Sequence, residues 1–153
     1  MSKGNTFEND LLKLIFNGTA IANIADNAGS SPLTNLYLAL HTADPGEAGD
    51  QTTSEAAYTS YARVAVTRNS GGWTVTGASV SPTANIEFPE KTGGSDGTAT
   101  YASIGTAASG AGKILYSGAL TPNIAYADGV IPRVKTTSTI TEGSSATRMV
   151  SFR

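Results

Sequence analysis

Apolar and polar residues alternate over one stretch in the first third of the chain, Leu36–His41. Leu36, Leu38 and Leu40 share one face of an extended chain, because successive strand side chains point to opposite sides. Pro45 follows shortly afterwards and lacks the backbone N–H that a continuing strand would need. The pattern therefore predicts a central strand with a face of leucines that ends before this proline.

One earlier segment has helical spacing instead. Its apolar positions, which fall on one side of a helix, are Phe7, Leu11, Leu14 and Ile15. We expect an amphipathic helix over about residues 5–18, with Gly18 as the residue that ends it. A helix of this length is marginal alone, so its apolar side must be covered, either by a sheet of this chain or by a partner subunit.

Residues 44–60 form a long polar segment. Its acidic residues are Asp44, Glu47, Asp50 and Glu55, but they lack the order of a calcium-binding loop. We expect a solvated loop here. A loop of this length is unusual in a compact domain, so we also expect it to be mobile until a partner covers it.

Short alternating runs separated by Gly, Pro and Asn continue to the end of the chain. They predict strands at 61–67, 73–76, 80–88, 98–105 and 113–120, and two or three more between 124 and 152. In the first of these runs, Ala62, Val64 and Val66 would point inward. Strands at this spacing, with no helices between them, indicate an antiparallel β-sandwich or jelly roll. We expect a mostly β single domain over residues 1–153 with one N-terminal helix.

Arg63 would lie on the opposite face of its strand from Val64, on the same side as Tyr61. A shielded guanidinium needs a carboxylate partner, and Glu55 is the nearest candidate along the chain. We therefore expect Arg63→Ala to lower the melting temperature more than Arg68→Ala. Because aromatic and arginine side chains dominate core and interface energies, Tyr61, Arg63 and Trp73, together with Glu55, are candidate structural or interface residues.

Composition narrows the possible functions. The chain of 153 residues has a formal net charge of −2, with ten scattered Lys and Arg residues. A general nucleic-acid binder would need these residues to be clustered, so we expect no such partner.

Cysteine is absent, which excludes disulfides and thiolate chemistry. The apolar runs are too short to span a bilayer and the first residues are unlike a signal peptide, so we expect a protein made in the cytoplasm.

Motifs for catalysis are not apparent in the sequence. The Gly-rich stretch 105–113 has Ile114 where a phosphate-binding loop requires Ser or Thr, and it joins two strands, so we interpret it as a hairpin loop. His41 is the only histidine and fits a structural residue better than a catalytic one. We expect no enzyme, no cofactor, no metal site and no small-molecule ligand. A sugar site lined by Tyr58, Tyr61, Tyr101 or Trp73 stays an alternative to packing.

The run Leu36–Glu47, which contains Leu-His-Thr-Ala-Asp-Pro-Gly, is followed by Glu55 and by Tyr61-Ala62-Arg63-Val64. This order resembles a family of small structural proteins of tailed bacteriophages and prophages, commonly labelled tail fibre proteins. The resemblance extends from about Phe7 to Leu120.

The resemblance implies a structural protein of the virion and supplies no catalytic residues. Our leading hypothesis is a capsid decoration, or cement, protein that bridges and stabilises capsid subunits. Its partners would be the major capsid protein, further copies of itself, or both. The alternative is a tail or tail-fibre component that contacts a receptor.

Overall fold

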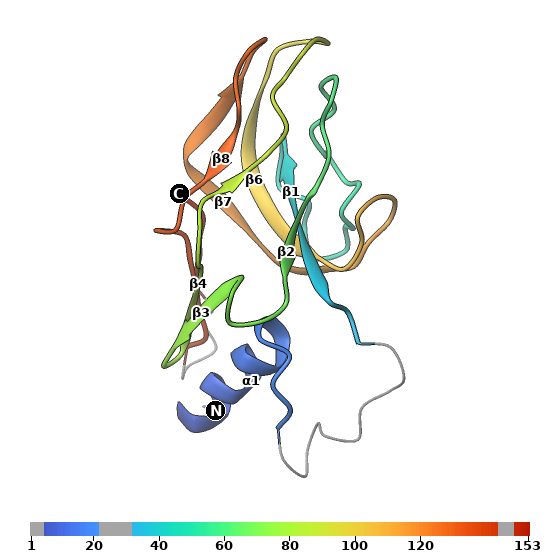
Figure 1. The fold of residues 1–153 in the computed structure, drawn as a ribbon. Coiled ribbons are helices and arrows are strands. Elements are labelled where there is room, and N and C mark those ends of the chain that lie inside the picture. The colour runs from blue at the N-terminus through green and yellow to red at the C-terminus, as the bar shows by residue number, and fades with distance from the viewer. Residues whose placement is uncertain (1–4, 22–31, 144–148) are drawn as a thin grey trace.

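The computed structural model describes residues 5–21, 32–143 and 149–153. Within these ranges the chain forms one helix, α1 (Asn5–Phe16), and ten strands. The strands make two four-stranded sheets and one two-stranded ribbon, and α1 lies at one end of them (Figure 1). The fold is mostly β with antiparallel strand pairing between the named strands, as the sequence predicts.

The first sheet contains the central strand that the leucine pattern predicts. Its order is β2 (Val64–Thr67), β1 (Asn35–His41), β6 (Gly97–Gly105) and β7 (Ile114–Tyr126). β1 pairs with β2 on one side and with β6 on the other. All three leucines of β1 are buried, so the prediction of a central strand with a leucine face is confirmed.

The second sheet is built from shorter strands. Its order is β10 (Met149–Ser151), β9 (Thr139–Thr141), β4 (Ser79–Pro82) and β3 (Trp73–Thr76). The separate ribbon pairs β5 (Ile86–Glu87) with β8 (Arg133–Val134). The predicted strand 80–88 is therefore divided between β4 and β5, and Ala84 between them is exposed.

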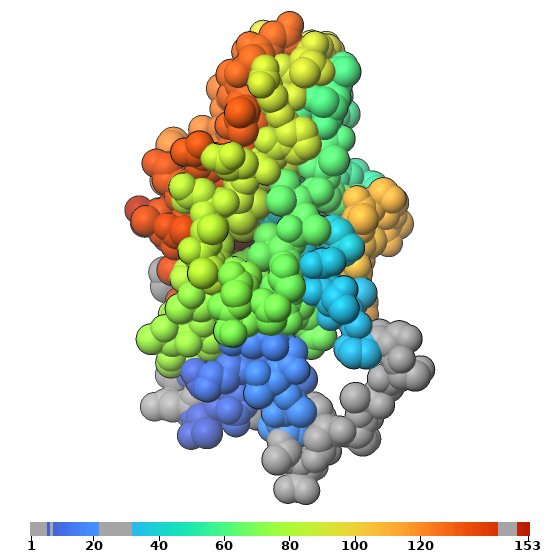
Figure 2. Space-filling view, viewed as in Figure 1, coloured from blue at the N-terminus to red at the C-terminus, as the bar shows by residue number. Residues whose placement is uncertain are grey.

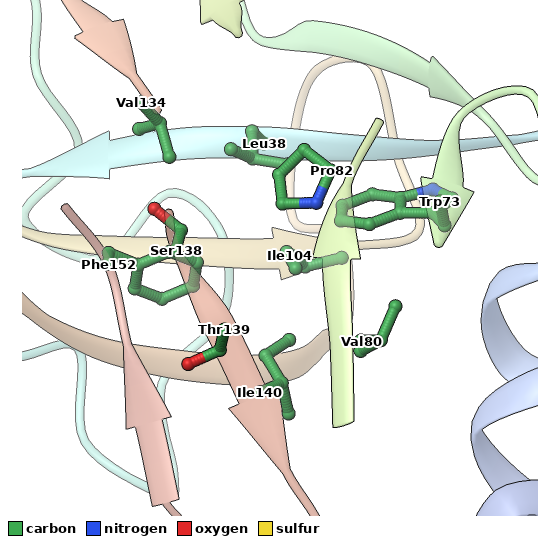
Figure 3. A pocket seen from close by; sticks show the side chains of 10 residues that line it. All are labelled: Leu38, Trp73, Val80, Pro82, Ile104, Val134, Ser138, Thr139, Ile140 and Phe152. Atoms are coloured by element: carbon green, nitrogen blue, oxygen red, sulfur yellow. The ribbon is translucent and has the colours of Figure 1, made fainter. Parts of the chain in front are cut away.

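The two sheets face each other across the hydrophobic core. Figure 3 shows Leu38 and Ile104 of the first sheet opposite Val80 and Ile140 of the second, with Trp73 beside them. The space left between the sheets measures only about 10 Å³, so the core is closely packed. A β-sandwich is confirmed, whereas the jelly-roll alternative is not shown by this strand order.

The helix packs on the sandwich through a different face from the one predicted. Leu12 and Phe16 are fully buried, whereas Leu11, Leu14 and Ile15 are only half-buried. The Phe16 ring meets the Trp73 ring edge-on, with the centroids 4.8 Å apart. In Figure 2 the helix, in blue, lies directly beneath the green surface of β3. The helix therefore covers the sheets of its own chain, and the side chain of Phe7 lies outside the described residues.

The helix ends two residues earlier than predicted, at Phe16, and Gly18 follows it with a φ of +65°. This left-handed conformation is the one that favours glycine after a helix. A second error concerns Ala62, which is exposed although the alternation places it inward. The strand begins only at Val64, and the preceding residues turn so that Arg63 is buried instead.

Candidate functional site

Residues 44–60 are a folded cover on the first sheet instead of a solvated loop. The N–H of Thr42 donates to the carbonyl of Ser54, and the N–H of Ala56 donates to the carbonyl of Leu40, each at 2.8 Å. Gln51, Ala56 and Tyr58 are buried. The segment therefore follows the edge of β1, where Ala56 and Tyr58 join the same hydrophobic core as the leucines, and the sequence-based prediction is wrong for these buried positions.

Arg63 and Glu55 form the central contact of this cover. The guanidinium donates from Nε to Oε1 at 2.7 Å and from a terminal nitrogen to Oε2 at 2.8 Å. The side chain of Arg63 is 2% exposed and that of Glu55 is 18% exposed. Hydrogen bonding to Glu55 raises the pKa of Arg63, so the charged form is the stable one. The pairing predicted from the sequence is confirmed.

The same guanidinium also holds the hairpin loop between β6 and β7. Its terminal nitrogens donate to the carbonyl of Ala107 at 3.0 Å and to that of Gly110 at 2.8 Å. Arg63 thus joins its own segment and the nearby Glu55 to a loop residue that lies 44 residues further along the chain. An open depression of about 240 Å³ lies over this contact, between Glu55, Arg63 and the loop residues Ala108–Gly110.

Tyr61 connects the ion pair to the central strand. Its hydroxyl donates to Oε1 of Glu55 at 3.1 Å and accepts from the N–H of Leu40 at 3.0 Å. Burial is the main cause that raises the pKa of Tyr61 well above the ordinary value of a phenol. The hydroxyl therefore stays protonated and serves as a bridge between a backbone donor and a carboxylate.

His41 lies beneath the cover and is fully buried. Its Nδ1 is 2.8 Å from the carbonyl of Thr53, and its Nε2 is 2.7 Å from Oγ of Ser103. A carbonyl can only accept, so Nδ1 carries the proton and Nε2 accepts from the serine hydroxyl. Burial lowers the pKa of His41 and favours this neutral ring. The interpretation of His41 as a structural residue is confirmed.

Gln51 has a role that the sequence did not indicate. Its side-chain amide donates to the carbonyl of Tyr37 at 3.1 Å and accepts from the N–H of Ala107 at 3.0 Å. Its backbone N–H donates to the carbonyl of Gly112 at 2.9 Å. One buried glutamine therefore joins β1, the cover and the hairpin loop. The glycines of the hairpin were the only available signal, because they leave room for a side chain from elsewhere.

Arg68 and Lys91 were also missed. Arg68 donates through Nε and its terminal nitrogens to the carbonyls of Ile15, Leu14 and Leu33. It therefore holds the last turn of α1, so Arg68→Ala is not a suitable low-effect reference for Arg63→Ala. Lys91 is fully buried and forms ion pairs with Asp96 and Asp128 at the tip of the ribbon.

Trp73 and Tyr58 are buried in the core, so neither offers a ring to a sugar. Tyr61 is partly buried against the same core and packs edge-on to Tyr58, with ring centroids 5.3 Å apart. Tyr101 is partly exposed and lines a hollow beside the start of β7. The structure thus brings Glu55, Tyr61 and Arg63 together, while Trp73 lies elsewhere, against α1.

The chemistry of this cluster is structural. The Glu55 carboxylate accepts three hydrogen bonds, one from the Tyr61 hydroxyl and two from the Arg63 guanidinium, so its oxygens are occupied by donors of the same chain. Over residues 5–21, 32–143 and 149–153, no group of three potential metal-binding side chains is found. In the same ranges, no helix is long and apolar enough to cross a membrane. The cluster is suited to holding the cover, the central strand and the hairpin loop in one rigid arrangement.

A family model described as "Podophage GP4 fiber I protein gp80" matches residues 2–142 of the chain. The match includes the central strand, the cover, Arg63 and the hairpin loop. No curated protein matches the chain.

Proposed function

The chain belongs to the podophage GP4 fibre I protein gp80 family, and from this membership we propose that it is a structural component of the tail fibres of a podophage virion. The match covers most of the chain, and this single observation carries the proposal. It favours the tail-fibre alternative of the sequence-based hypothesis over capsid decoration. The family also supports a location in the virion.

The geometry supports a mechanical role. Arg63 ties its own strand region to the cover through Glu55 and to the hairpin loop through Ala107 and Gly110. Gln51 makes a second, independent connection between the cover and the same loop. Polar groups that are fully paired in this way specify one arrangement and resist local opening. A module of this kind can transmit force between its neighbours without changing shape.

The experiment that tests the proposal is localisation in purified virions. A small epitope tag at an exposed turn, such as the one at Gly77, would be detected with gold-labelled antibody by electron microscopy. We expect label at the tail. Particles with the same tag on the major capsid protein are the control and should be labelled over the whole shell.

Loss-of-function particles provide a second readout. Virions without the protein should retain the thermal stability of their capsids and lose adsorption to host cells. Label spread over the capsid, or genome release at lower temperature with normal adsorption, would overturn the fibre proposal and support capsid decoration.

A further inference from the structure

A basic hollow of about 500 Å³ lies beside the second half of β7. Three cationic side chains from the chain after β7 line it, Arg133 and Lys135 at β8 and Arg153 after β10. The other lining residues are neutral, namely Thr121, Pro122, Asn123, Ile124, Ala125 and Thr137. Among the described residues, none that lines this hollow is acidic.

Two of the three cations have no acidic partner in the described part of the chain. Arg133 pairs with Glu87 across the ribbon at 2.5 Å, and both side chains are about half exposed. The guanidinium of Arg153 donates to the hydroxyl of Ser151, at 3.3 Å, and no acidic group pairs with Arg153 or Lys135 among residues 5–21, 32–143 and 149–153. In a chain with a net charge of −2, the hollow is therefore a local excess of positive charge.

An acidic turn, residues 42–48, lies beside the first half of β7 and carries the opposite charge. Asp44 and Glu47 are exposed there, and they line a different hollow together with Leu115 and Ser117. The turn is rigid. Oδ1 of Asp44 accepts from the N–H of Gly46 at 2.9 Å, and Gly46 has a φ of +69°. A rigid turn loses little conformational entropy when it binds a partner.

The acidic turn and the basic hollow of one molecule are too far apart to touch each other. One lies beside Leu115 and the other beside Ile124, and a strand rises about 3.3 Å per residue, so they are roughly 30 Å apart along β7. In Figure 1 the two regions also lie on opposite sides of the view, with the C-terminus and β8 on the left and the segment after β1 on the right. A contact between them requires a second molecule.

We propose that the acidic turn of one copy, residues 42–48, binds in the basic hollow of another copy. The turn and the hollow have complementary charge, and both belong to the same chain. The hollow also lacks the aromatic and methionine anchors that larger interfaces with unrelated proteins use. The inference goes beyond the proposed function, because it concerns the isolated protein wherever that protein lies in the virion.

The geometry of this contact is head-to-tail. A two-fold dimer would need turn and hollow on one face, whereas here they lie on opposite sides. Repetition of a head-to-tail contact gives a ring or an open chain of copies. Exposed ion pairs are individually weak, so a single contact gives low affinity and repeated contacts in one assembly are needed for tight attachment.

The test uses two charge variants of the full chain. The turn variant carries Asp44→Asn and Glu47→Lys, since asparagine keeps the acceptor for Gly46. The hollow variant carries Lys135→Glu and Arg153→Glu. A control variant carries Lys113→Glu and Glu90→Lys, which reverse two exposed charges outside both regions. Sedimentation velocity at high protein concentration and low salt measures association.

The wild type and the control variant should form species larger than dimers, and these should dissociate as salt screens the charges. Each charge variant alone should be monomeric. An equimolar mixture should again form species larger than dimers, because the reversed turn matches the reversed hollow and the unchanged turn matches the unchanged hollow, so the two variants can alternate. A chain with all four substitutions should associate again.

Association of either charge variant alone at the wild-type level would overturn the proposal. So would a monomeric wild type, or a mixture that stays monomeric while circular dichroism shows both variants folded. None of these results depends on where the protein lies in the virion, so the tail-fibre proposal can fail or hold independently.

Discussion

Both carboxylate oxygens of Glu55 accept hydrogen bonds from the guanidinium of Arg63, at 2.7 and 2.8 Å. Replacing Arg63 with alanine leaves this carboxylate without its cation and leaves two loop carbonyls without donors. Removal of one partner of a buried pair costs about 3–5 kcal/mol. We expect Arg63→Ala to lower the free energy of unfolding by an amount near the lower limit of this range, since the side chain of Glu55 is 18% exposed. Urea unfolding measures the change in the free energy of unfolding.

The matched control is Arg133→Ala. Arg133 also pairs with a glutamate, at 2.5 Å, but both side chains are about half exposed. Exposed pairs contribute about 0.2–1 kcal/mol, so the control should change stability little. If Arg63→Ala changed the free energy of unfolding as little as Arg133→Ala does, the contact with Glu55 would have no structural role.

Arg68→Ala should release the helix from the sandwich. The guanidinium of Arg68 donates to carbonyls of the last turn of α1 and to Leu33. Hydrogen bonds to charged groups contribute about 1.5–3 kcal/mol each, and the helix is otherwise held by its buried face. Hydrogen exchange should accelerate in α1 and stay unchanged in β1. The exposed Lys113→Ala serves as the control, and uniform acceleration in both elements would contradict a local anchor.

Gly112→Ala should destabilise the hairpin loop. A Cβ at this position would lie 2.1 Å from Oε1 of Gln51 and 2.7 Å from Cβ of Ala107. Gln51 is fully buried and cannot move aside without breaking its hydrogen bonds. Overpacking of this kind costs about 1–3 kcal/mol. The control is Gly93→Ala, whose nearest neighbour would be 3.4 Å away, and thermal unfolding compares the two.

The stability of the protein should fall as the solution becomes acidic. His41 has a lowered pKa in the folded state because it is buried, whereas its ordinary value is 6.5. Below about pH 6.5 the unfolded chain binds a proton that the folded chain does not, so the free energy of unfolding decreases with falling pH. The free energy of unfolding stops decreasing once the pH is below the pKa of His41 in the folded protein.

Denaturant unfolding at several pH values between about 5 and 8 measures this effect. His41→Asn should flatten the dependence over that interval, even if the variant is less stable at every pH. A wild-type slope that persists unchanged in the variant would assign the effect to other groups.

Local patterns predicted the elements of this fold well. The alternation of leucines located β1, and the glycine-rich stretch 105–113 was correctly interpreted as a hairpin loop. The arginine–glutamate pair was also predictable, since a shielded guanidinium requires a nearby carboxylate. These inferences depend only on periodicity and on the chemistry of single residues.

The prediction failed where distant segments decide the environment. Polar composition made residues 44–60 look solvated, but Gln51 is buried because hairpin glycines create space for it. Helical periodicity could not show that Leu12 is more deeply buried than Leu11, because this depends on where Trp73 lies. The contacts of Arg68 were not predicted, since its partners are backbone carbonyls, which leave no mark in the sequence.

The buried ammonium group of Lys91 has a practical consequence for chemical labelling. Its Nζ donates to the carbonyl of Gly94 at 2.9 Å and is held by two aspartates, which raises its pKa. Amine-reactive cross-linkers need an accessible, uncharged amine, so this lysine should stay unmodified in the folded protein. The exposed Lys113 and Lys135 should react instead. Cross-links from Lys113 and Lys135 would therefore report neighbours in the virion, and modification of Lys91 would mark unfolded chains.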